Sequence, residues 1–284
     1  MMGYPDDMPW LVLRLQQQSF AVPSLEVREV ITLPPVASVP GIPSYFRGLI
    51  NLRGQALPLM DLRKRLGMPS ALDQVHAFRD LMVQREQDHR RWLDELEASV
   101  REKRPFTLAM DPHQCAFGRW YDSYEAPDPW TKSLLRKFDH PHQRLHGAAR
   151  QIEALKVHGD TQAMAKLLGR ERNTTLAVLL KLFGELQALI LETHREVAMV
   201  VERRGLDAFA ATADEAQSVV SLTADSVQDL PSGMGIADRE AVTHVARHPG
   251  SQELLMLLEP SCLLAGPGRQ NVKGLSDPLV SPPH

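Results

Sequence analysis

The stretch that decides how the chain begins to fold is Phe46-Arg-Gly-Leu-Ile-Asn-Leu-Arg-Gly-Gln-Ala-Leu-Pro-Leu-Met-Asp-Leu-Arg63. Two short apolar runs within it, 49–52 and 55–60, flank the dipeptide Arg53-Gly54. A glycine-containing turn between two such runs is typical of a β-hairpin. We therefore expect two strands that meet at Arg53-Gly54.

Outward from this hairpin, toward the N-terminus, the chain keeps the character of β-structure. Prolines recur from Pro23 to Pro58, and proline is not tolerated in the interior of a long helix. The apolar runs that predict further strands are 10–15, 19–23 and 26–31.

Toward the C-terminus, the spacing of the apolar residues changes at about Leu72. Between Phe78 and Val100 they recur with the helical period of about 3.6 residues, and His89 falls on the same face. The predicted helical segments are 78–100, 115–124, 130–138, 141–158 and 161–194, the last as one long leucine-rich helix or two. Residues 73–195 therefore predict an all-α, four-helix-type bundle.

After His194 the strand signals return, at 197–201, 219–222 and 253–258. Neither β part alone has enough strands to bury a good core, so we expect one β domain that a helical domain interrupts. The predicted boundaries are 8–72 and 196–265 for the two β parts, 73–195 for the insert and 266–284 for a disordered tail. The predicted fold class is thus α+β, with more than one domain.

Composition excludes several classes of protein. The 284 residues fit about two domains, and the net charge of −3 offers no basic excess for nucleic acid or for a polybasic membrane anchor. Only Cys115 and Cys262 are present, which excludes a disulfide framework, and we expect Cys262 to be a buried core residue. The N-terminus has no apolar leader and no run of 18 apolar residues occurs, so we expect a cytoplasmic protein without membrane insertion.

The histidines carry the first sign of chemistry, because eight of the eleven lie between His76 and His194. His142 and His146 are four residues apart, which places them on one face of a helix, and His89 and Cys115 lie in the same helical segment. Three imidazoles and one thiolate make a tetrahedral set that suits zinc. His113 and His140 remain alternatives by spacing alone, and each of these residues can also be read as an ordinary packing residue.

The helical segment resembles a known family. The motifs His89-x-x-Trp92, Asp111-Pro-x-x-Cys115-x-Phe-Gly-x-Trp-Tyr121 and Asp139-x-Pro-His142-x-x-Leu-His146 occur in the order of the bacterial chemoreceptor zinc-binding domain, CZB. The resemblance covers most of residues 75–195. It implies zinc held by His89, Cys115, His142 and His146, and a Cys–zinc centre that responds to oxidants such as hypochlorous acid or to zinc itself.

The flanking β parts resemble the CheW-like domain. The stretch 46–63 is similar to the family pattern G-x-x-N-x-R-G-x-x-x-P-x-x-D-L, and the later strands fit its second half. The resemblance implies two small β-barrel-like subdomains and a scaffold between chemoreceptors and the histidine kinase CheA. Asn51 and Arg53 are the candidate partner-binding residues, and Asn51 can alternatively serve the turn by a backbone hydrogen bond.

Three functions follow as hypotheses. The first is a non-enzymatic signalling scaffold with a zinc-dependent sensor, with homodimerisation through the helical domain as a further possibility. The second is an interaction module with a purely structural zinc. The third, a zinc hydrolase, is disfavoured because four protein ligands leave no open position on the metal and no His-Glu-x-x-His motif occurs.

Overall fold

The computed structural model divides into two compact units. Met1–Ala71 with Arg195–His284 form the first, here called the β unit, and Leu72–His194 form the second, the helical unit. The predicted disordered tail, 266–284, lies outside the described residues. The described residues are 7–126, 128–202, 207–230, 241–251 and 253–265.

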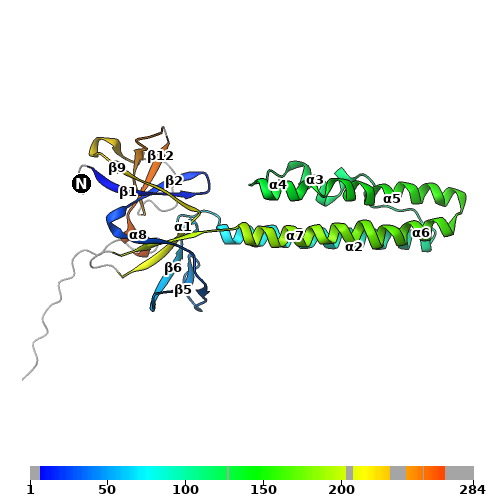
Figure 1. Ribbon diagram of the computed structural model, residues 1–284, viewed down its shortest axis with the longest axis horizontal. Coiled ribbons are helices and arrows are strands. Elements are labelled where there is room, and N and C mark those ends of the chain that lie inside the picture. Colours follow the sequence, from blue (N-terminus) through cyan, green and yellow to red (C-terminus); the bar gives the residue numbers. More distant parts are fainter. Residues whose placement is uncertain (1–6, 127, 203–206, 231–240, 252, 266–284) are drawn as a thin grey trace, which may run out of the picture. The chain divides into compact units, whose positions relative to one another are not determined.

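The β unit contains two sheets within its described residues, and each has six strands. The first sheet has the order β10-β11-β12-β2-β1-β9, and the second has the order β3-β7-β8-β6-β5-β4. Both sheets therefore combine strands that precede the helical unit with strands that follow it (Figure 1). The strands are β1 Met8–Leu15, β2 Gln18–Pro23, β3 Val27–Thr32, β4 Val36–Ala37, β5 Phe46–Leu52, β6 Gln55–Asp61, β7 Val197–Val201, β8 Phe209–Ala213, β9 Glu215–Leu222, β10 Val227–Asp229, β11 Val242–Arg247 and β12 Leu254–Leu258.

The predicted hairpin is present as β5 and β6. Leu52 pairs with Gln55, and the two turn residues Arg53 and Gly54 both have positive φ, at 52° and 89°. A two-residue turn of type I′ requires positive φ at both positions, which explains the glycine. Gly48 is needed for a different reason, because a Cβ there would lie 2.0 Å from the carbonyl oxygen of Ala37 on β4.

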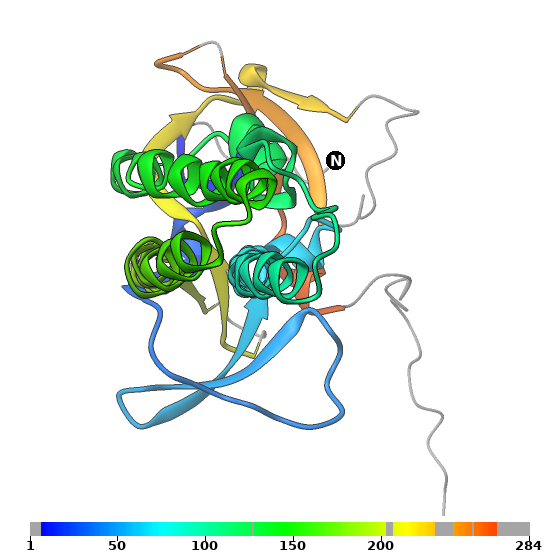
Figure 2. The ribbon, with the colours of Figure 1, turned by 90° about the vertical axis from the view of Figure 1, so that its right-hand side faces the viewer.

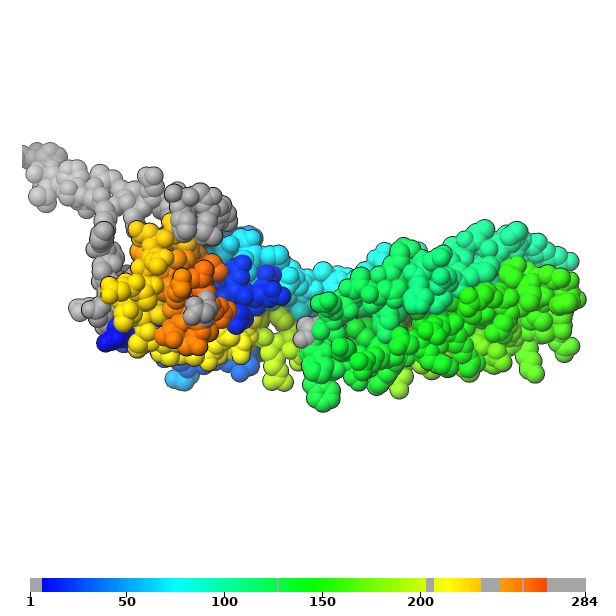
Figure 3. Space-filling view, turned by 90° about the horizontal axis from the view of Figure 1, so that it is seen from above, coloured from blue at the N-terminus to red at the C-terminus, as the bar shows by residue number. Residues whose placement is uncertain are grey.

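The helices of the helical unit pack side by side, as the end-on view in Figure 2 shows. Their side chains form the closely packed, elongated body of this unit in Figure 3. The helices are α2 Ala71–Arg101, α3 Ala116–Ser123, α4 Pro129–Arg136, α5 Asp139–His158, α6 Thr161–Glu171 and α7 Ala177–Thr193; the β unit adds α1 Leu62–Arg65 and α8 Pro260–Ala265. The chain is therefore mixed α+β, with a helical region between two β parts, as predicted.

Local sequence sets the helix ends. Asp128 caps α4 and Asp160 caps α6 through their carboxylates, and Gly159 ends α5 with φ of 67°. Cys115 caps α3, where its sulfur accepts the Gly118 N–H. The Cys115 side chain thus stabilises the N-terminus of α3.

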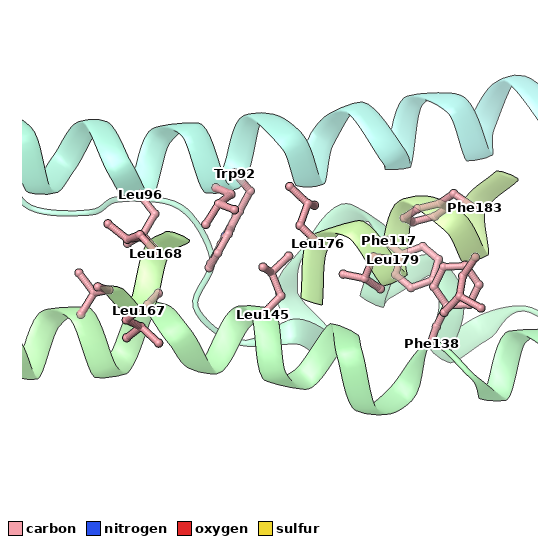
Figure 4. Close-up of a cluster of buried hydrophobic side chains, with 14 of the residues drawn as sticks. Trp92, Leu96, Phe117, Phe138, Leu145, Leu167, Leu168, Leu176, Leu179 and Phe183 are labelled. Atoms are coloured by element: carbon pink, nitrogen blue, oxygen red, sulfur yellow. The ribbon is translucent and has the colours of Figure 1, made fainter. Parts of the chain in front are cut away.

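The core of the helical unit is one continuous cluster (Figure 4). Phe117, Phe138 and Phe183 gather at one end of the view, and Leu167 and Leu168 lie toward the other. Phe183 on α7 is 0% exposed, as are Leu179 and Leu186. Burial of these side chains stabilises the unit by roughly 1.5–3 kcal/mol each.

The helical run Thr161–Thr193 has the length and mean hydropathy, 1.6, of a membrane span. One such helix is weak evidence, because the core helix of a globular unit gives the same signal. Here the apolar side chains of α7 contribute to the core described above. A π-helical turn, Arg172–Leu176, joins α6 to α7, so the region is a continuous helix with an irregularity and not two separate helices.

Some sequence expectations need correction. Cys262 is half-buried and not a fully buried core residue, because α8 turns its neighbour Leu263 into the core instead. The strands β4, β8, β10 and β11 were not predicted. β8 is Phe-Ala-Ala-Thr-Ala, whose alanines carry no strand signal, and its burial between β6 and β7 decides its conformation.

Candidate metal centre

Four side chains of the helical unit converge, and they are the four that the resemblance implied. His89 comes from α2, Cys115 from the N-cap of α3, and His142 and His146 from α5. One ligand atom of each lies within 4.8 Å of the others. We call these four residues the His/Cys cluster. Their elements are joined by long stretches of chain, so the cluster ties three parts of the unit together.

Two of the three histidines, His89 and His146, are held by a backbone carbonyl. The His89 ring nitrogen Nδ1 lies 2.7 Å from the carbonyl oxygen of Arg85, one turn earlier on α2. His146 Nδ1 lies 3.0 Å from the carbonyl oxygen of Ala109, which also accepts the Trp92 indole N–H at 2.8 Å. A carbonyl can only accept, so both Nδ1 atoms carry the proton and both Nε2 atoms keep a free lone pair.

These two lone pairs point to a metal. Nε2 of His89 and Nε2 of His146 are buried and have no hydrogen-bond partner. An unsatisfied buried polar atom costs about 1–3 kcal/mol, and native proteins avoid it. His142 Nε2 lies 3.3 Å from Cys115 Sγ. Tetrahedral zinc, with bonds of about 2.0–2.3 Å, separates its ligand atoms by about 3.3–3.6 Å. The His142–Cys115 distance matches this separation, the other ligand atoms lie within 4.8 Å of one another, and a set of three imidazoles and one thiolate suits this ion.

Burial explains the protonation states of the cluster. It lowers the pKa of His89, brings that of His142 to about 2 and that of His146 to about 4, with further lowering of the latter two by the neighbouring imidazoles. The histidines are therefore neutral at physiological pH, as metal ligands must be. Burial raises the pKa of the Cys115 thiol, although the hydrogen bonds from the Gly118 and Phe117 amides oppose this effect.

Aromatic side chains enclose the cluster. The ring of Phe117 lies 5.0 Å from that of His142, and Phe183 lies 5.6 Å from His89. On the Cys115 side the enclosure opens into a groove of about 1010 Å³, which is lined by residues of α2 and of the segment 108–117. His89, Cys115 and His146 belong to its wall. The groove wall thus includes part of the cluster, of which Cys115 is the half-buried member.

The alternative histidines lie elsewhere. His113 is exposed and pairs with Asp122, with 2.9 Å between its Nδ1 and the carboxylate. Asp122 accordingly raises the pKa of His113, the opposite of the shift seen in the cluster. His140 is exposed on the first turn of α5. The structure brings neither to the other four residues.

The two candidate partner-binding residues lie at the β5–β6 turn in the β unit. Asn51 is exposed, and its Oδ1 accepts the Gly54 N–H at 2.9 Å, which supports the turn. The Arg53 side chain is 80% exposed and makes an ion pair with Glu29 at 2.8 Å. The ion pair of Arg53 is exposed and therefore weak, whereas Asn51 has a structural role in the turn.

Comparison with known proteins agrees with both parts. Residues 9–90 match the family model of the CheW-like domain, and residues 89–153 match that of the chemoreceptor zinc-binding domain, which spans the whole His/Cys cluster. The two resemblances inferred from the sequence are thereby confirmed, and zinc is the metal named by the second family.

Curated chemotaxis proteins match a part of this chain. The probable chemotaxis protein CheW of Rhizobium etli is 42% identical over 65 residues, which are 23% of this chain and 42% of that protein. The chemotaxis protein CheW of Bacillus subtilis is 36% identical over 79 residues, 26% of this chain and 51% of that protein. The chain thus spans about half or less of the length of these relatives.

A solved structure also matches at low similarity. It is the crystal structure of the scaffolding protein TtCheW from Thermoanaerobacter tengcongensis, with 12% identity and a TM-score of 0.45 over 96% of this chain and 97% of that chain.

Proposed function

We propose that this chain, which combines a CheW-like domain with a chemoreceptor zinc-binding domain, is a non-enzymatic chemotaxis scaffold with a zinc-dependent sensor. In this function the β unit couples chemoreceptors to the histidine kinase CheA in the cytoplasm. The observation that carries the proposal is the His/Cys cluster, whose thiol borders a solvent groove in a unit that interrupts the CheW-like domain. At the level of fold, the proposal includes two barrel-like β subdomains and a four-helix-type bundle.

The zinc ligands in this proposal are His89, Cys115, His142 and His146. Two unpartnered buried nitrogens and the close approach of His142 to the thiol support the assignment. Zinc would hold Cys115 as a thiolate, which a buried thiol with a raised pKa is not by itself. Because the ligands come from three elements, metal binding contributes to the folding free energy of the helical unit.

Cys115 is the oxidant-sensing group. Its thiolate sulfur gives two electrons to hypochlorous acid and takes up the hydroxyl group, so that a sulfenic acid forms and chloride leaves. The sulfenic acid is uncharged and a poorer ligand than the thiolate. The groove beside Cys115 admits an oxidant of this size.

The signal passes to the β unit through the two chain crossings. The chain leaves the β unit at Ala71 and returns to it at Arg195, next to the ends of α2 and α7. A helical unit that loses one of four ligands becomes less stable and restrains these ends less. The β unit then binds CheA or the receptor with changed affinity.

Two further candidates have separate supports. A purely structural zinc fits the tight enclosure by Phe117 and Phe183, and a homodimer through the helical unit fits its exposed α7 residues Val178 and Leu191. A zinc hydrolase fits less well, because four protein ligands leave no position for water. A structural zinc would stay bound under mild oxidant, and a dimer would show in the molar mass in solution.

The test is metal analysis of the full-length chain with and without hypochlorous acid. We expect wild type to carry zinc and to lose it on oxidation, and Cys115→Ala to bind it weakly from the start. Cys262→Ala and His113→Ala are the matched controls, because each removes a ligand type outside the cluster, and both should behave as wild type. Wild type without zinc, or unchanged CheA binding by oxidised protein and by Cys115→Ala, would contradict the proposal.

A further inference from the structure

Both chain crossings meet one buried guanidinium, that of Arg47 on β5. Arg47 donates from Nε and Nη2 to Asp61 at 3.0 and 2.8 Å, and from Nη1 and Nη2 to Glu196 at 2.5 and 2.8 Å. The side chain of Arg47 is 10% exposed, and those of Asp61 and Glu196 are 1% and 3% exposed. The contact with Glu196 is bidentate, and two nitrogens of the same planar group converge on one oxygen, Oδ2, of Asp61. Four charge-assisted hydrogen bonds with so little exposure fix geometry far better than exposed ion pairs do.

The outgoing crossing is held through Asp61. This residue ends β6 and caps α1, where its Oδ1 accepts the Lys64 N–H at 3.0 Å. Its Oδ2 also accepts the hydroxyl of Ser70 at 2.6 Å. Ser70 is buried and immediately precedes α2. The last residue before the long helix is therefore linked to Arg47 through one carboxylate.

The returning crossing is held through Glu196. This residue lies between the end of α7 and the start of β7, and its carbonyl oxygen accepts the Leu33 N–H at 3.3 Å. In the sheet, β8 and β6 lie between β7 and β5. The Arg47–Glu196 ion pair therefore connects β5 to the residue that precedes β7, although these two strands are not neighbours in the sheet. It does so where the chain returns from the helical unit.

We propose that Arg47 is a positioning residue that fastens both crossings to strand β5, so that changes in the helical unit reach the β5–β6 hairpin. This inference rests on the function proposed above and names its route of regulation. β5 continues from Arg47 to Asn51, and the hairpin ends in the exposed Arg53. A displacement of Ser70 or Glu196 thus acts, through a single rigid group, on the strand that presents the candidate partner-binding residues.

The variant Arg47→Lys tests this role. Lysine keeps the positive charge, but its single nitrogen cannot reproduce the four hydrogen bonds that the Arg47 guanidinium donates to the two carboxylates. Arg47→Ala is unsuitable, because it leaves two buried carboxylates without a counter-ion, which strongly destabilises the sheet. Glu196→Gln is the second variant. Glutamine has the shape of glutamate but lacks its charge, so this change weakens only the contact between Arg47 and the returning crossing. Arg28→Lys is the control, because Arg28 makes exposed contacts with Glu202 and Gln55 in the same sheet.

Hydrogen exchange of the full chain, without any partner, gives the readout in zinc-loaded and zinc-stripped protein. In wild type and Arg28→Lys we expect zinc removal to speed exchange in the hairpin, residues 46–61, by about fivefold or more, the lower end of typical coupling. In Arg47→Lys and Glu196→Gln the hairpin response should fall below about twofold, while α2 and α5 still respond.

Two results would overturn the inference. One is a hairpin response in Arg47→Lys as large as in wild type, and the other is no hairpin response in wild type. The proposed function fails independently, if partner binding is insensitive to zinc and oxidant while the hairpin still responds.

Discussion

Gly118, within the zinc motif, has no room for a side chain. A Cβ at this position would lie 1.8 Å from the carbonyl oxygen of Pro112 and 2.8 Å from its carbonyl carbon. The same glycine donates its N–H to Cys115 Sγ at 3.1 Å. Gly118→Ala therefore forces apart the turn before α3 and the first turn of α3, the two segments that hold the thiol in place.

The size of the effect follows from the overlap. A carbon–oxygen contact needs about 3.3 Å, so the turn at Pro112 or the start of α3 must move by about 1.5 Å. Strain of this kind in a packed site costs about 3 kcal/mol, which corresponds to a loss of roughly 10 °C in Tm for a unit of this size. Displacement of the sulfur and loss of its amide donor should weaken zinc binding about 10–100-fold.

Thermal unfolding with and without zinc, together with a competition assay for zinc, measures both quantities. Gly184→Ala and Gly147→Ala are matched controls, since no atom lies within 4 Å of a Cβ built at either position. Both lie inside helices, so alanine should stabilise the protein by about 0.5–1 kcal/mol. The reasoning is refuted if Gly118→Ala unfolds within about 2 °C of wild type and binds zinc equally well.

Three further outcomes are expected. Trp92→Phe leaves the carbonyl of Ala109 with one donor fewer and should cost about 1–2 kcal/mol in chemical denaturation, with weaker zinc binding. Asn51→Ala should destabilise the protein by about 1 kcal/mol, because the turn loses its side-chain hydrogen bond. Arg53→Ala should leave the stability within about 0.5 kcal/mol of wild type and weaken only partner binding. The reverse pattern would contradict this division between a structural and a binding residue. In zinc-free protein burial lowers the pKa of His146 to about 4, below the ordinary value of 6.5, so the unfolded state takes up a proton at higher pH than the folded state does. His146 alone should therefore lower the free energy of unfolding by up to about 3 kcal/mol between pH 6.5 and 4, and His89 and His142, whose pKa values are lowered as well, should add to this loss. Urea titrations across this pH range measure the fall, and a flat profile would exclude buried neutral imidazoles.

Much of the site was predictable because its determinants are local. His142 and His146 share a helix face by their spacing alone, and the helical period of the apolar residues around His89 turns that side chain inward. The hairpin at Arg53-Gly54 follows from the same kind of short-range rule, since a two-residue turn demands a residue that tolerates positive φ. Motif order then distinguished the four cluster residues from His113 and His140.

What the sequence by itself determined is therefore the type of each long element, the interruption of β-structure by helices and the identity of the candidate ligands. Only the tertiary structure decided which ring nitrogens of His89 and His146 keep a free lone pair. The reason is that their Nδ1 atoms donate to the carbonyls of Arg85 and Ala109, and these contacts cannot be read from the spacing of residues in the sequence. It also decided the conformation of β8, whose alanines form a strand only between β6 and β7. The meeting of Glu196 with Asp61 on Arg47 is of the same kind, because Glu196 lies more than a hundred positions from the other two and reaches them only when the sheet has formed.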